Sequence, residues 1–188
     1  MLLGHQTKMQ NNCMVLNNEF TFFQNLLLNL LTRRVVFKKF EDGMKNTHLT
    51  EHNDVVALFW YGYIVSQLSD CRKFFDRDNN AHSFQFVVRH LKNDSLRKKH
   101  GELFETWKNG KLETVINKYL LHADMRFEEI DTKVSVQVLN SFIDELEKYI
   151  KQMIDDLAKN YSIGALNYDG FLPEREREVD IFFEQVRK

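Results

Sequence analysis

The stretch SVQVLNSFIDELEKYIKQMIDDL, residues 135–157, decides the fold class. Its apolar residues alternate steps of three and four, which is the spacing of one face of an α-helix. Ser135 stands where a helix N-cap is expected, because its hydroxyl can accept a hydrogen bond from a first-turn amide. The pattern predicts one wall of an antiparallel bundle, and it leaves a dimer interface open as an alternative. The apolar face consists of Val136, Leu139, Ile143, Leu146, Ile150, Met153 and Leu157.

The composition of the whole chain also favours helices. Of 188 residues, 43% are hydrophobic and 13% are aromatic, which is enough for one sizeable core. One proline and seven glycines leave few turns for a chain of hairpins. We predict an all-α protein, an antiparallel helical bundle of about five main helices plus short helices. Residues 18–188 are expected to form this single domain, and residues 1–17 are expected to be an N-terminal extension and a candidate for poor order.

Capping residues, glycines and the proline predict where the other helices begin and end. Gly101 and Gly110 are expected to bracket a separate short segment. Pro173 suits the first turn of the last helix, since a first-turn amide needs no partner. The second helix, which contains Trp60, is expected to be the most buried. Three more helices are expected. One begins after the capping residues 17–19, one spans residues 54–75, and one spans residues 84–91 and is capped by Ser83.

Charge and cysteine content exclude several classes of protein. The net charge is −1, so the chain as a whole has no electrostatic attraction that would indicate a nucleic-acid or membrane partner. Cys13 and Cys71 form no CxxC pair, which argues against a disulfide framework or a zinc ribbon. The longest apolar run, residues 55–65, is too short to cross a bilayer. These features favour a cytoplasmic protein without a membrane partner.

The stretch INKYLLHADMR, residues 116–126, holds the main candidate site. In a helix, Lys118, His122 and Arg126 would lie one turn apart along one face. An imidazole between two cations tends to stay neutral at pH 7, and a general base requires that form. The alternative is a half-buried structural histidine beside cations of the solvated face.

Two other groups receive simpler interpretations. The most basic run, RHLKNDSLRKKH at residues 89–100, is explained by a solvated helix face, although it could also hold phosphates. His48 and His52 have a spacing that suits a metal only within a helix, and no third ligand can be named. We therefore predict no metal site and no cofactor.

Two blocks of the sequence resemble the HEPN superfamily, in particular its abortive-infection-related, AbiU-like branch, with a HEPN-like core at about residues 54–157. FFDRDNNAHSF, residues 74–84, is similar to an acidic turn that precedes a Ser-initiated helix in that branch. NKYLLHAD, residues 117–124, is similar to a stretch in which an Arg-polar pair precedes a histidine. The resemblance implies a helical bundle that commonly dimerises. Active members of the superfamily are metal-independent endoribonucleases that use an Arg and a His four to six residues apart, so the resemblance also implies this activity.

The resemblance implies His122 as the catalytic histidine. Its imidazole would remove the proton of a ribose 2'-OH, whose oxygen attacks the adjacent phosphorus while cations stabilise the developing charge. Asn117 stands where active members have Arg, so catalysis would fall to His122 with Asn117 and Lys118, and Arg126 would bind substrate. A lysine lacks the bidentate fork of arginine, so the missing Arg puts activity in question.

A second place matches the Arg-polar-three-His pattern literally, namely RDNNAH at residues 77–82. Arg77 and His82 are therefore further candidates for substrate binding. Asp76 and Asp78 offer Arg77 simpler partners, and the expected turn argues against a site.

Two main functions follow as hypotheses. The first is a HEPN-like RNA-binding protein, a metal-independent endoribonuclease of toxin or phage-defence type, in which catalysis has been either kept or lost. The second is a non-enzymatic dimeric bundle that acts as a protein-protein interaction or antitoxin-like module. A third, a small-molecule-binding helical bundle, rests only on Trp60, Tyr61 and Tyr63, which a place in the core explains more simply. RNA, a second copy of the chain, and a cognate toxin or antitoxin are the expected partners.

Overall fold

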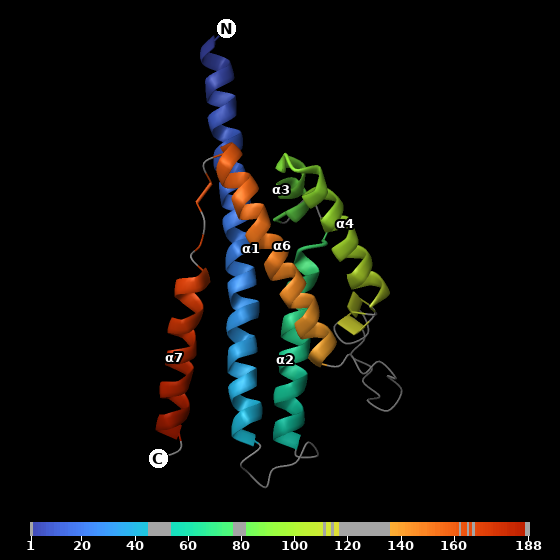
Figure 1. The fold of residues 1–188 in the computed structure, drawn as a ribbon, viewed down its shortest axis with the longest axis vertical. Coiled ribbons are helices and arrows are strands. Elements are labelled where there is room, and N and C mark those ends of the chain that lie inside the picture. The colour runs from blue at the N-terminus through green and yellow to red at the C-terminus, as the bar shows by residue number, and fades with distance from the viewer. Residues whose placement is uncertain are drawn as a thin grey trace.

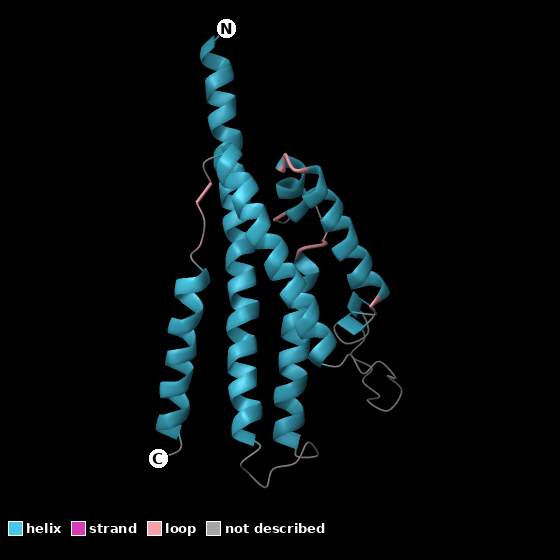
Figure 2. Cartoon of the chain, in the orientation of Figure 1, coloured by secondary structure: helices cyan, strands magenta, loops and turns pink. Residues whose placement is uncertain are grey.

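The computed structural model describes residues 2–44, 54–76, 82–110, 112–113, 115–116, 136–161, 163–164, 166 and 168–186. Every regular element within these ranges is an α-helix (Figures 1 and 2). The predicted all-α helical bundle is thereby confirmed. The labelled helices are α1 (Leu2–Met44), α2 (Asp54–Lys73), α3 (Phe84–His90), α4 (Asp94–Asn109), α6 (Val136–Tyr161) and α7 (Tyr168–Val186).

Helix α1 is the central element, because it packs against α2, α3, α6 and α7. Figure 1 shows α2 and α7 on opposite sides of α1, with α6 crossing α1 and α2 obliquely. The short α3 lies against α1, and α4 packs mainly on α6. The amino-terminal turns of α1 extend beyond the other helices (Figure 1).

The core lies where α6 meets α1, α2 and α4. The predicted apolar face of α6 is buried from Leu139 to Leu157, so the three-and-four spacing identified it correctly. Phe142 and Tyr149 add aromatic bulk to the same face. Since helices of the same chain cover this seam, it is not available as an interface for a second copy. The buried α6 side chains are Leu139, Phe142, Ile143, Leu146, Tyr149, Ile150, Met153 and Leu157.

The predicted start of the first helix is wrong, because α1 begins at Leu2 instead of after residues 17–19. Residues 2–17, expected as an extension, belong to this helix, and the Leu16 side chain is fully buried. The polar residues that resembled a cap bind other elements instead. Asn17 accepts a hydrogen bond from the amide of Gly164, and Glu19 accepts one from the amide of Ser83.

Two further boundaries differ from the predictions. Gly101 lies inside α4 and does not end a segment there, because the buried stripe of the helix runs past it on another face. Pro173 lies inside α7, which begins at Tyr168.

The predicted burial of α2 was also too high. Trp60 is 36% exposed, and the described side chains of α1 and α6 supply more of the core.

Candidate functional site

Most of the predicted site residues lie outside the described part of the chain. These residues are Asn117, Lys118, His122, Arg126 and Arg77, together with the linker histidines His48 and His52. Ile116, the first residue of the main candidate stretch, is described and buried in the core. The next described residue is Val136, the first residue of α6. His82 is the one predicted site residue whose side chain is described.

His82 precedes α3 and lies against α1. Its ring stacks on Phe22 with 4.0 Å between the ring centroids and 17° between the ring planes. Its Nδ1 atom is 3.1 Å from Oε1 of Glu19. Glu19 and Phe22 are three residues apart on α1 and therefore share one face of that helix. The His82 side chain remains 49% exposed.

The Glu19 carboxylate also fixes the start of α3. Its second oxygen, Oε2, accepts a hydrogen bond of 3.0 Å from the backbone amide of Ser83. Ser83 in turn caps α3, since its hydroxyl accepts from the amide of Phe86 at 3.3 Å, as its position in the sequence predicts. One carboxylate thus orients both the imidazole and the helix that follows it.

This geometry fixes the orientation of the His82 ring. An ionised carboxylate can only accept hydrogen bonds, so neutral His82 donates from Nδ1 and carries its free lone pair on Nε2. Among the described residues, Nε2 has no hydrogen-bond partner. A base oriented by a carboxylate is the arrangement that general acid–base catalysis uses. Sequence reasoning missed Glu19 and Phe22 because only the packing of α1 against α3 brings them to His82.

Three cations of the basic run at residues 89–100 have acidic partners in the described structure. Arg97 pairs with Asp94, and Lys98 lies 3.8 Å from Glu102. Lys99 lies 3.4 Å from Glu145 on α6. These acidic partners support the interpretation as a solvated helix face.

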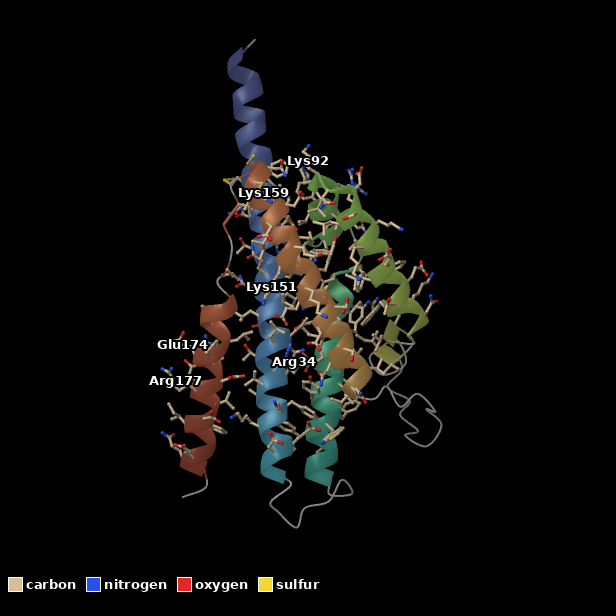
Figure 3. All side chains as sticks on the ribbon, viewed as in Figure 1. Arg34, Lys92, Lys151, Lys159, Glu174 and Arg177 are labelled. Atoms are coloured by element: carbon tan, nitrogen blue, oxygen red, sulfur yellow. The ribbon has the colours of Figure 1, made fainter. Side chains whose placement is uncertain are left out.

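Three of the cations labelled in Figure 3 contact other side chains. Arg34 of α1 pairs with Asp144 and lies 3.6 Å from Glu147. Lys151 lies 3.1 Å from the same Glu147. Lys92 lies over the ring of Tyr161, 5.9 Å from its centroid. Carboxylates therefore balance the charge of Arg34 and Lys151, whereas Lys92 contacts a ring.

His100, the last residue of the basic run, is buried, and α4 directs it into the core. Its ring lies among Phe75, Phe84 and Tyr149, with centroid distances of 5.8, 5.6 and 6.2 Å. Burial lowers the pKa of His100, because the charged imidazolium loses its hydration. Its exposed fraction is 4%, so it is a structural residue and cannot contact a substrate.

Comparison of the chain with models of protein families, with curated proteins and with solved structures finds no match. Within the described ranges, every helix is too short or too polar to cross a bilayer.

Proposed function

We propose that this protein is a HEPN-like RNA-binding protein with metal-independent endoribonuclease activity of the toxin or phage-defence type, acting in the cytoplasm. The observation that carries the proposal is the half-exposed His82, which Glu19 orients through Nδ1 and which ends the RDNNAH pattern. The all-helical bundle and the resemblance of residues 117–124 to the same superfamily support it further.

The chemistry requires a base and a cation. Neutral imidazole takes the proton of a ribose 2'-OH, and the resulting oxygen attacks the adjacent phosphorus. The bond from phosphorus to the 5'-oxygen breaks, which leaves a 2',3'-cyclic phosphate and a 5'-hydroxyl once the leaving oxygen is protonated. A guanidinium or ammonium stabilises the phosphorane charge. Arg77 would serve with His82, whereas Asn117 and Lys118 would serve with His122, and Arg126 would bind the substrate phosphates.

The non-enzymatic dimer rests on the missing Arg at Asn117 and on the apolar seam of α6. Because that seam is buried inside the bundle, it gives this second function no support. RNA is the partner that we propose.

The test incubates the purified full-length chain with mixed RNA in excess EDTA and analyses the products on a gel. The variants are His82→Ala, Glu19→Gln and His122→Ala. His90→Ala is the matched control, because His90 is also partly exposed but its Nδ1 lies 2.8 Å from the carbonyl of Phe86 and contacts no carboxylate. Circular dichroism checks that each variant folds.

We expect the wild type and the His90 variant to cleave. Loss of the base is expected to slow cleavage by about 10²–10⁴-fold, the usual contribution of general acid–base catalysis. If His82→Ala cleaves slowly and Glu19→Gln has a weaker effect, His82 is the base. If His122→Ala cleaves slowly instead, His122 is the base. No cleavage by the wild type, or equal cleavage by all proteins, would refute the ribonuclease proposal.

A further inference from the structure

A cleft of about 360 Å³ lies between α1 and α2, away from His82. Both helices contribute apolar side chains to it, and a single arginine supplies its cationic group. The size is near the lower end for small-molecule sites in proteins. The lining residues are Arg33, Val36, Phe37, Leu58, Phe59, Gly62, Tyr63 and Ser66.

One part of the cleft is aromatic and apolar. Phe37 stacks on Tyr63 with ring centroids 3.9 Å apart, and Phe59 stacks on Phe40 at 3.7 Å. Leu58 is 68% exposed, the highest value among the exposed large apolar side chains of the described structure. A Cβ atom added to Gly62 would meet no atom within 4 Å. The α2 wall is thus open where an apolar chain would lie.

The other end of the cleft carries an excess of positive charge. Arg33 pairs with Oδ2 of Asp70, and Lys73 Nζ lies 2.7 Å from Oδ1 of the same carboxylate. Two cations therefore share one anion. The Nε atom of Arg33 is also buried without a hydrogen-bond partner among the described residues. The Arg33 side chain as a whole is 33% exposed, so a carboxylate in the cleft can reach its outer N–H groups while Nε stays covered.

From this arrangement we infer that the α1–α2 cleft binds a single-chain anionic amphiphile, a carboxylate of the fatty-acid class. The carboxylate lies at Arg33, where it balances the excess charge and accepts a charge-assisted hydrogen bond. The alkyl chain lies along Phe37, Phe59 and Leu58, which removes apolar surface from water. The small volume of the cleft suits one chain and not a two-chain lipid.

Trp60 supplies the readout. It is 36% exposed, and its ring centroid lies 5.2 Å from that of Phe37, so its fluorescence should respond to a chain in the cleft. The other tryptophan, Trp107, is 1% exposed and gives a constant background. The titrants are decanoate, decanol and decyltrimethylammonium, each kept below its micelle concentration.

We expect saturable binding of decanoate, about tenfold tighter than that of decanol, as one hydrogen bond to a charged group predicts. The cationic amphiphile should bind no better than decanol. Arg33→Gln should remove the preference for decanoate over decanol. Equal binding of all three titrants by the wild type would overturn the inference.

Gly62→Leu tests the location. The Cβ of the leucine meets no atom within 4 Å, and its side chain would occupy the cleft and should abolish decanoate binding. Gly101→Leu is the matched control, because Gly101 is also inside a helix, in α4, and also has open space around an added Cβ. Unchanged decanoate binding by Gly62→Leu would refute the site.

Sedimentation tests whether a second copy of the chain, instead of an amphiphile, occupies the cleft. A wild-type dimer that Gly62→Leu dissociates would mean that a second copy covers the cleft, and the inference would fall. None of these measurements uses RNA, so their outcome is independent of the ribonuclease proposal.

Discussion

His100 is a titratable side chain inside the core, on the face of α4 that also buries Leu103 and Trp107. Burial lowers its pKa from the ordinary value of 6.5, and the backbone of Phe74, which favours the protonated form, offsets this only in part. Its Nε2 atom has no hydrogen-bond partner of normal geometry in the described structure. The folded protein therefore keeps this ring neutral under conditions in which the unfolded chain protonates it.

We expect acid to destabilise the protein through this residue. Because the folded pKa is lowered, the unfolded chain binds the proton first, so the free energy of unfolding falls as the pH drops below about 6.5 and levels off below the folded pKa. The loss can reach about 1.4 kcal/mol per pH unit. Urea unfolding of wild type and His100→Leu between pH 7.5 and 5 measures it, and the variant should have the shallower slope. Equal slopes for wild type and His100→Leu would contradict the prediction.

Two tyrosines of the core differ in whether their hydroxyl has a partner. Tyr149 OH is buried without one among the described residues, whereas Tyr63 OH donates a hydrogen bond of 2.6 Å to Asn140 Oδ1. Tyr149→Phe should leave stability unchanged or raise it by up to about 1 kcal/mol, because it removes an unsatisfied group. Tyr63→Phe should cost about 1 kcal/mol, since a hydrogen bond is lost. Thermal unfolding of both variants checks the order, and a larger loss for Tyr149→Phe would show that its hydroxyl has a partner after all.

Helix α4 contains one glycine inside the helix and another directly after it. Gly101 lies on its exposed side, where an added Cβ meets nothing within 4 Å. Gly110 is the C-cap, and a Cβ there would lie 2.7 Å from the backbone oxygen of Thr106. The same chemical change therefore has opposite consequences at the two positions.

Gly101→Ala should stabilise the protein by about 0.5–1 kcal/mol, since alanine loses less conformational freedom in a helix than glycine. Gly110→Ala should destabilise it by about 1–3 kcal/mol, because the methyl group forces the last turn apart. Chemical denaturation of the two variants measures both effects. A loss of stability in Gly101→Ala would mean that the position is covered, which the described structure does not show.

For the whole molecule, α1 connects parts of the chain that are distant in sequence. The buried Gln24 donates to the carbonyl of Gly164 at 3.2 Å and accepts from the amide of Leu166 at 2.8 Å. Lys39, farther along α1, lies 2.5 Å from Asp180 of α7. The link between α6 and α7 is thus held to α1 by a side chain more than a hundred residues away.

Gln24→Ala should release this link. The loss of two part-buried hydrogen bonds should cost about 1–3 kcal/mol. The amide of Leu166 should exchange with solvent faster, because its acceptor is removed. Hydrogen exchange read at single residues tests this, with Asn25→Ala as control, since Asn25 is the exposed neighbour on the same helix. Unchanged exchange at Leu166 would show that Gln24 does not hold the link.

The sequence predicted well wherever the deciding interactions are local. The three-and-four spacing identified α6 and its buried face, and Ser83 was correctly placed as the cap of α3. The start of α1 failed because Asn17 and Glu19, which have capping side chains, bond to other elements. Gly101 and Pro173 were given too much weight, since tertiary packing keeps α4 and α7 helical through them.

The sequence by itself determined that this is an all-helical bundle, because helical periodicity and the shortage of turn residues are properties of neighbours along the chain. It also singled out His82 as a candidate. Only the tertiary structure decided what surrounds that histidine, since Glu19 lies 63 positions earlier and reaches it through the packing of α1 against α3. The same holds for the charge at Arg33 and Asp70, 37 positions apart, because no local pattern shows which side chains two packed helices bring together.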